Sequence, residues 1–151
     1  MAIPPTRIAL PQDAPEWLRM RRALWPDCTE ERHALEIQQL TAPEHPGVVF
    51  VASRSPDALC GFAELSIRCD HVDGSSSVPI AYVEGWYVDP DMRGGGVGRR
   101  LIEAAEQWAL ACGFKELASD AELDNDPGIQ AHLSCGFVEA CRAVHFIKRL
   151  A

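Results

Sequence analysis

A glycine-rich stretch about two-thirds of the way along the chain has the residue types of an anion-binding site. It is followed directly by an amphipathic stretch, and it consists of Arg93, Gly94, Gly95, Gly96, Val97 and Gly98. The first amides of a helix have no partner within the helix and carry part of its dipole's positive charge, so they attract anions. Successive glycine amides can also curve around a phosphate. The stretch therefore predicts an anion site, although a glycine-rich turn before a helix can also be a plain tight connection.

The spacing of these glycines narrows the kind of site. The stretch lacks the Lys-Ser/Thr pair of a P-loop and does not match the dinucleotide spacing G-x-G-x-x-G. It does match R-x-x-G-x-G, straight after an apolar strand that ends Val88-Asp89-Pro90. Strand, V-D-P, loop and helix together resemble the pyrophosphate loop of the GCN5-related N-acetyltransferases (GNAT), which bind acetyl-CoA. The resemblance implies a cofactor site that comprises Tyr87, Val88, Arg93, Gly94, Gly95, Gly96, Val97 and Gly98, with Asn125 and His132 further along the chain.

Composition bounds the class of protein. The 151 residues, 47% apolar and 24% charged, predict a single domain over 1–151 with a proper core. The net charge of −8 disfavours nucleic-acid binding, and it either attracts a polycationic substrate or simply keeps the protein soluble. We expect no membrane span and no signal peptide, hence a cytoplasmic protein. The six cysteines include no C-x-x-C pair, so we expect reduced thiols and no metal site.

Periodicity and turn residues predict the order of elements. We expect a strand at 6–10, helices at 13–24 and 29–40, strands at 48–53 and 59–69, and a long polar loop at 70–79. The central strand at 82–88, a helix at 97–112, a strand at 115–120 and a short helix after 124 follow, and one or two final strands are expected within 138–150. This order predicts an α/β (α+β) fold, a mixed sheet with helices on both faces. It is also the order of elements in the GNAT acyl-CoA N-acyltransferase fold.

Further segments resemble one subgroup of that family. They are Leu24-Trp25-Pro26, Ser66-Ile67-Arg68, Asp73-Gly74, Glu84-Gly85, Ala118-Ser119-Asp120 and Gly136-Phe137. In this order and spacing they resemble the aminoglycoside 6′-N-acetyltransferases, over nearly the whole chain. The resemblance implies acetylation of the 6′-amine of kanamycin-type antibiotics, with acetyl-CoA as co-substrate, and hence antibiotic resistance. In that family the long loop reaches the neighbouring subunit's site, so a homodimer is implied too.

The resemblance makes Trp25, Glu84 and Asp120 candidate contacts to the aminoglycoside, and Glu84 and Asp120 candidate catalytic residues. An ammonium-rich sugar favours carboxylates and an aromatic face. Glu84 is the first candidate for the base, acting directly or through a water. Each residue also has a plainer interpretation: an ion pair within the sheet for Glu84, a solvated turn for Asp120, and core packing for Trp25.

Three positions depart from the subgroup. His71 stands where the long loop is expected to carry an aromatic hydroxyl, and Cys141 stands where another acidic substrate contact is expected. Cys28 lies near the place of a histidine that should follow the Trp-Pro pair. His71 and Cys141 remain candidate substrate contacts. The departures bear on which aminoglycosides are accepted more than on the chemistry.

Direct transfer from acetyl-CoA requires a donor for the developing oxyanion, and the Val88 N–H is the candidate. His132 occupies the place where many acetyltransferases carry an acidic tyrosine; it either donates a proton to the thiolate or packs and binds the cofactor. Two other functions stay open. One is acetylation of another small polyamine or amino sugar, and the other is non-catalytic acetyl-CoA binding as a sensor.

Overall fold

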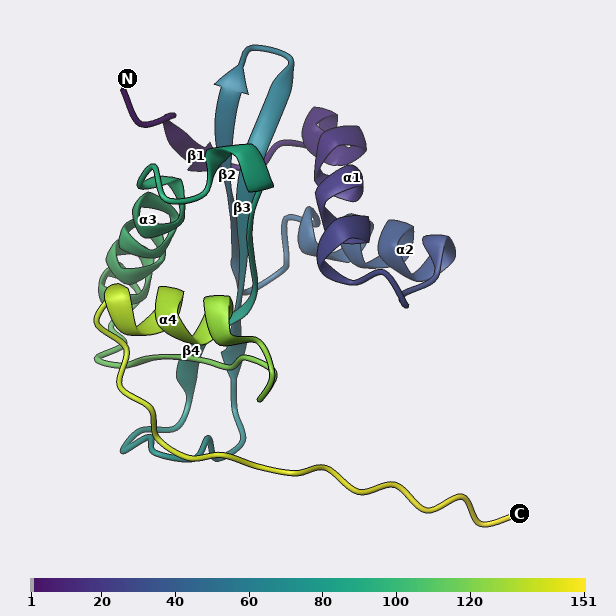
Figure 1. Cartoon of the computed structure of the whole chain (residues 1–151), viewed down its shortest axis with the longest axis vertical. Helices are drawn as coiled ribbons and strands as arrows, with labels where there is room; N and C mark the ends of the chain where they lie inside the picture. Colours follow the sequence, from purple (N-terminus) through teal and green to yellow (C-terminus); the bar gives the residue numbers. More distant parts are fainter. Residues whose placement is uncertain (1) are drawn as a thin grey trace.

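A five-stranded mixed sheet forms the centre of the computed structural model, which describes residues 2–151 (Figure 1). The strands lie in the order in which they occur in the chain: β1 (Thr6–Ile8), β2 (Val48–Ser55), β3 (Ala58–Arg68), β4 (Ile80–Val88) and β5 (Leu117–Ser119). Strands β1 to β4 are antiparallel, whereas β5 runs parallel to β4. The predicted mixed sheet is confirmed.

Helices cover both faces of this sheet, as the sequence predicts (Figure 1). On one face lie α1 (Ala14–Leu24) and α2 (Glu30–Leu40), whose Trp17, Met20 and Ile37 pack on Val49, Val51 and Phe62. On the other face lies α3 (Val97–Ala111), whose Leu101, Ile102 and Ala105 pack on Ala63, Leu65 and Val83. The short α4 (Asp126–Ser134) is tied to α3, because Arg99 Nη2 donates to the Ser134 carbonyl at 2.6 Å. Two short 3₁₀ turns, η1 (Pro11–Asp13) and η2 (Pro90–Met92), precede α1 and the glycine loop.

The helix ends follow local sequence signals. Thr29 Oγ1 accepts a hydrogen bond from the Arg32 amide at 3.2 Å and so caps α2. After α3, Gly113 adopts φ +90°, the left-handed conformation that ends many helices and that glycine adopts without strain. Both ends lie within a residue or two of the predicted positions.

Two irregularities of β4 matter for the site. Glu64 pairs with Gly85 and Leu65 pairs with Val83, so Glu84 has no partner and forms a β-bulge. On its other side β4 pairs with β5 only as far as Val83 and Ser119, although β4 continues to Val88. β5 ends at Ser119, so residues 84–88 of β4 have no paired strand on that side among the described residues, and we call this unpaired stretch of the β4 edge the gap.

The predicted final strands are wrong for this structure. Residues 138–151 form neither helix nor strand, and Figure 1 shows them running away from the body of the molecule. Their apolar side chains are largely exposed: Val138, Val144, Phe146, Ile147 and Leu150. The alternating apolar pattern is typical of a strand, but a strand also requires a neighbour that pairs with its backbone.

Two further observations concern residues 2–151 alone. No helix there combines the length and the apolar character that crossing a bilayer requires. All six cysteines are free thiols, and no group of three or more histidine, cysteine or acidic side chains is arranged to hold a metal ion.

Candidate active site

The glycine loop presents bare backbone at the start of α3. Gly94 and Gly96 have φ of +78° and +93°, so side chains there would be strained. Gly96 is the N-cap of α3, and the amides of Val97 and Gly98 begin its first turn. A Cβ on Gly98 would lie 3.2 Å from the Trp86 ring. The loop therefore fits a pyrophosphate, because residues 94–96 bring a helix N-terminus to it with no side chains of their own.

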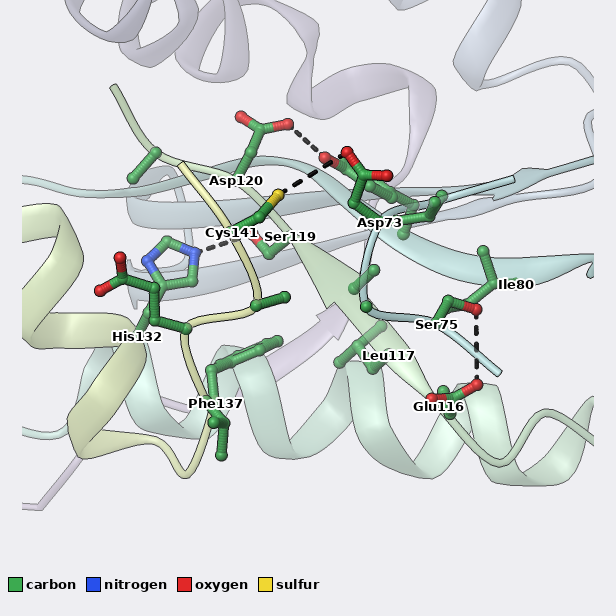
Figure 2. Close-up of a pocket in the computed structure, with 18 of the residues that line it drawn as sticks. Asp73, Ser75, Ile80, Glu116, Leu117, Ser119, Asp120, His132, Phe137 and Cys141 are labelled. Atoms are coloured by element: carbon green, nitrogen blue, oxygen red, sulfur yellow. Dashed lines mark hydrogen bonds between the residues drawn. The ribbon is translucent and has the colours of Figure 1, made fainter. Parts of the chain in front are cut away.

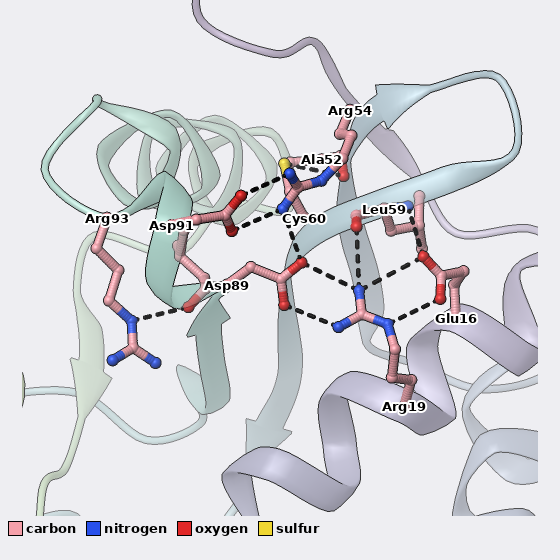
Figure 3. Close-up of polar contacts among 10 residues, drawn as sticks. Glu16, Arg19, Ala52, Arg54, Leu59, Cys60, Asp89, Asp91 and Arg93 are labelled. Atoms are coloured by element: carbon pink, nitrogen blue, oxygen red, sulfur yellow. Dashed lines mark hydrogen bonds and ion pairs between the residues drawn. The ribbon is translucent and has the colours of Figure 1, made fainter.

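Buried charge fixes the turn that leads into this loop (Figure 3). Asp89, only 6% exposed, accepts hydrogen bonds from Arg19 at 2.9 and 3.1 Å and from Arg54 at 3.1 Å. Burial works against the ionised form of Asp89, but the two guanidinium groups hold its pKa below the usual value. The V-D-P turn is thereby locked to α1 and to the β2–β3 hairpin.

The end of β4 directs one amide into the gap. The Asp89 N–H donates to the Cys60 carbonyl at 2.8 Å, so these two residues form a hydrogen-bonded pair. Such pairs alternate with non-hydrogen-bonded ones in an antiparallel ladder, which makes Val88 and Gly61 the non-bonded pair. The Val88 N–H and C=O therefore point away from β3, toward the side of β4 on which β5 pairs further back. Arg93 Nε donates to that carbonyl at 2.9 Å, and the N–H faces the gap.

Trp25 and Glu84 come together in a cleft of about 340 Å³ on the α1–α2 face of the sheet. The cleft is lined by Trp25, Glu36, Gln39, Leu40, His45, Glu64 and Glu84. Trp25 also packs against Phe62, with ring centroids 6.2 Å apart, so it serves the core and the cleft at once. It can lie flat on β4 because residue 85 is glycine: a Cβ there would lie 2.4 Å from the Trp25 ring.

Glu84 is held within the sheet by an ion pair, as its plainer interpretation predicts. Arg68 donates from Nε and Nη2 to its two oxygens, each at 2.8 Å, and Ser66 Oγ donates at 2.6 Å. Burial opposes ionisation of Glu84, but Arg68 and Ser66 together keep its pKa below the usual value. Glu84 is thus an ionised carboxylate at neutral pH, and 35% of its side chain is exposed.

Asp120 and Cys141 lie in a second, larger pocket of about 820 Å³ beside β5 (Figure 2). His71 also lines this pocket. The exposed carboxylate of Asp120 accepts a hydrogen bond from the Tyr82 hydroxyl. His71 and Cys141 both approach Asp73 instead, at 3.7 and 3.6 Å. Glu84 and Asp120 therefore line different pockets. They are linked through Arg68, whose guanidinium lies 3.4 Å from the centre of the Tyr82 ring.

The other residues predicted to contact the cofactor differ in which of their groups are available for binding. His132, in α4, lies with Nδ1 2.7 Å from the Gly128 carbonyl and Nε2 2.7 Å from Ser119 Oγ (Figure 2). Asn125 Oδ1 accepts from the Gly128 amide at 3.1 Å and so caps α4. The Tyr87 side chain is buried in the core between β4 and α1, so only its backbone is available to a cofactor.

Sequence reasoning missed a buried charge cluster behind the cleft. Arg21, 1% exposed, donates to both Glu64 and Glu36, and Trp17 Nε1 donates to Glu64 at 2.9 Å. Sequence reasoning also assigned no role to Arg68. Alternation along β3 is the signal that could have placed Glu64 and Arg68 beside the site, since every second residue of a strand shares a face.

Comparison with known proteins identifies the family. The model of the acetyltransferase (GNAT) family matches residues 15–137. An aminoglycoside N(6′)-acetyltransferase type 1 of Stenotrophomonas maltophilia is 41% identical over 143 residues, 95% of this chain and 92% of that protein. The protein of the same name from Klebsiella aerogenes is 41% identical over 140 residues, 91% of each chain.

Solved structures agree with this assignment. A complex of AAC(6′)-Iy with the bisubstrate analogue CoA-S-monomethyl-acetylneamine superposes with a TM-score of 0.89 at 30% identity, over 98% of this chain and 99% of that one. The apo 6′-N-acetyltransferase AAC(6′)-IG of Acinetobacter haemolyticus gives 0.87 at 35% identity, over 97% and 99%. The chain therefore belongs to the acetyltransferase (GNAT) family, alongside the aminoglycoside N(6′)-acetyltransferases.

Proposed function

We propose that the protein transfers the acetyl group of acetyl-CoA to the 6′-amino group of aminoglycosides, and so confers resistance to them. One observation carries the proposal: the gap along the β4 edge has an anion-binding loop at one end and an acidic, aromatic cleft beside Glu84. The curated relatives are named for this reaction, and one structural neighbour holds CoA joined to an acetylneamine.

Acetyl-CoA fits the loop side of the gap. The amides of Gly96, Val97 and Gly98 would hold the pyrophosphate, with Gly94 and Gly95 keeping side chains out of the way and Arg93 adding positive charge. The Val88 N–H would donate to the oxyanion that develops on the thioester carbonyl. His132 and the Asn125 amide would contact the pantetheine arm from α4, and Tyr87 would contribute through its backbone.

The aminoglycoside fits the α1–α2 face. Glu84 and Asp120 would attract its ammonium groups, and the Trp25 ring would support a sugar. Glu84 would accept the proton of the reacting amine, directly or through a water, which leaves the neutral amine to attack the thioester. His71 and Cys141 would contact more distant rings. No covalent enzyme intermediate is needed.

Thiol release from acetyl-CoA tests the proposal. Kanamycin A and tobramycin are compared with an analogue that lacks the 6′-amine, and mass spectrometry identifies the product. We expect turnover with the first two and none with the analogue. Turnover that persists with the analogue would favour another amine as acceptor, and tight acetyl-CoA binding without turnover on any amine would favour a sensor.

We also propose that the protein works as a homodimer, in which the C-terminal tail of each copy, residues 138–151, binds its partner. β5 is the last strand of the sheet, so its outer edge has no strand beside it. The 820 Å³ pocket is bounded by β5 on one side and by Phe137 and the start of the tail, residues 138–143, on the other. Cys141 and Ala140 hold that start against the 70–79 loop. The exposed Val144, Phe146 and Ile147 of a second copy have the apolar, alternating pattern of a strand that could pair with β5.

Light scattering coupled to size exclusion tests the dimer. We expect about 33 kDa for the wild type, twice the 16.6 kDa of one chain, and a monomer for Phe146→Asp. Leu110→Asp is the matched control, because Leu110 is also apolar and exposed but lies on α3. A wild-type monomer, or a dimer that survives Phe146→Asp, would count against the exchange of tails.

Two smaller predictions accompany this function. A single domain over 1–151 is supported by the sheet that contacts α1 and α3, with α2 packed on α1. A cytoplasmic location is supported by six free cysteines, because oxidising compartments favour disulfides.

A further inference from the structure

Arg68 at the end of β3 is placed among the groups that would receive the acceptor, although no role has been assigned to it. It makes a two-point contact with Glu84, at 2.8 Å from each of two nitrogens. Such forked pairing of a guanidinium with a carboxylate fixes geometry as well as charge. Of the Arg68 side chain 41% is exposed, so the pair faces the open site and is not buried in the core.

The contact leaves the two oxygens of Glu84 unequal. Oε1 accepts from both Arg68 Nε and Ser66 Oγ, whereas Oε2 accepts only from Arg68 Nη2. A carboxylate oxygen has two lone pairs. Oε1 is therefore saturated, and Oε2 is the atom that can still accept from an amine or a water.

The same guanidinium reaches the second carboxylate indirectly. It stacks 3.4 Å from the centre of the Tyr82 ring, and the Tyr82 hydroxyl donates to Asp120. One cation thus contacts Glu84 directly and orients the group that holds Asp120. Arg68 lies on β3, Tyr82 and Glu84 lie on β4, and Asp120 is the residue after β5, so these contacts link three neighbouring strands.

We propose that Arg68 is a positioning residue for acetyl transfer. It holds Glu84 so that only Oε2 is open to the acceptor amine, and it is the cation with which the acceptor's ammonium group must share the Glu84 carboxylate. The proposal rests on the proposed function and names a residue that controls the same site. Arg68 acts as an internal counter-ion, which orients the Glu84 carboxylate and affects its protonation.

The charge around Glu84 determines the expected pH dependence. Arg68 is its cationic partner, while Tyr82 and Asp120 lie on the β5 side and Glu36, Glu64 and His45 share its cleft. Of the carboxylates in the cleft, Glu64 and Glu36 already bind Arg21. Removing Arg68 leaves Glu84 with burial and acidic neighbours but no cation, so its pKa must rise.

Arg68→Gln and Arg68→Lys, compared with the wild type, test the proposal by aminoglycoside acetylation across pH. For Arg68→Gln we expect kcat to fall about tenfold, KM for the aminoglycoside to stay equal or fall, and the acid limb of kcat/KM to move to higher pH. Arg68→Lys, which keeps the charge but not the fork, should restore the acid limb and only part of kcat. An acid limb that does not move in folded Arg68→Gln would overturn the proposal, even if activity falls.

A readout without turnover separates this proposal from the function beneath it. The carboxyl carbon of Glu84 is followed by ¹³C NMR against pH in the wild type and in Arg68→Gln, with Glu84→Gln assigning the signal. A higher pKa in Arg68→Gln is expected, and an unchanged one refutes the role of Arg68. Failure of the wild type to acetylate any aminoglycoside would instead reject the proposed function, and the NMR result would stand on its own.

Discussion

Glu84→Gln is the substitution that most directly separates chemistry from folding at this site. Glutamine keeps the size and shape of the side chain, and its oxygen can still accept from Ser66 or Arg68. What it removes is one negative charge and the ability to accept a proton. The change lies at a β-bulge on the surface of the cleft, so no core packing is lost.

The structure sets the size of both effects. The ion pair with Arg68 is 35–41% exposed, and pairs of that kind are worth about 0.2–1 kcal/mol. Set against a total of about 5–15 kcal/mol, this loss leaves the protein folded. A positioned base contributes about 10²–10⁴-fold to rate, so we expect kcat to fall at least about 100-fold. KM for the aminoglycoside should rise by about 10-fold, because a charge-assisted hydrogen bond of about 1.5–3 kcal/mol is weakened.

Steady-state kinetics with kanamycin A, product mass spectrometry and urea unfolding measure these effects. Glu103→Gln is the matched control, since Glu103 is exposed on α3 and loses the same charge far from the cleft. A kcat for Glu84→Gln within about threefold of the wild type, with the 6′-acetylated product unchanged, would refute Glu84 as the base. A large loss of stability would instead show that the ion pair holds the sheet together.

Three other substitutions test neighbouring parts of the argument. Gly85→Ala places a Cβ 2.4 Å from the Trp25 ring, so KM for the aminoglycoside should rise by up to about tenfold, whereas KM for acetyl-CoA should not change. A KM for the aminoglycoside equal to that of the wild type would show that Trp25 does not contact the acceptor. Arg21→Met leaves the buried Glu64 without its cation, while Glu36 keeps Arg32, and should lower the free energy of unfolding by about 3–5 kcal/mol in urea, whereas exposed Arg22→Met should change it by less than about 1 kcal/mol. Asp89 has a lowered pKa, so it stabilises the fold above about pH 4 and loses this effect on acidification. Asp89→Asn should therefore be less stable than the wild type at pH 7, with a difference that shrinks below pH ~4; a constant difference would contradict this.

The sequence predicted the parts of the fold that local signals determine. Thr29 caps α2 and Gly113 ends α3, and each is a short-range effect that does not depend on the rest of the chain. The glycine loop is likewise a local pattern, and it does lie at the start of α3, while its role as an anion site stays a prediction. The tail could not be predicted in this way, because Val144 and Phe146 have the pattern of a strand whether or not a partner is present. A strand depends on its neighbour, and among residues 2–151 no strand pairs with the backbone of residues 138–151.

The site residues show the same difference between local signals and non-local pairing. Trp25, Glu84 and Asp120 are all predicted to contact the aminoglycoside; Trp25 and Glu84 share a cleft, whereas Asp120 lines another pocket. The separation of Glu84 from Asp120, and the position of Arg68 between them, depend on which strands lie side by side and in what register. That information is not local: Ser66 pairs with Tyr82 and Arg68 with Ile80, and only this pairing brings the guanidinium to Glu84. A family resemblance named the residues without stating what holds them.

The β-bulge at Glu84 accounts for the arrangement of the whole site. Before the bulge Val83 faces α3, and by simple alternation Gly85 would face α3 as well. The extra residue reverses the alternation: Gly85 lies against Trp25 on the α1 face, and Trp86 packs on Gly98 on the α3 face. Two successive residues, Glu84 and Gly85, therefore face the acceptor cleft, one with a carboxylate and one with room for an indole ring. The same reversal brings Trp86 against the loop that would hold the pyrophosphate. One unpaired residue thus places the cleft of Glu84 and the glycine loop on opposite faces of β4.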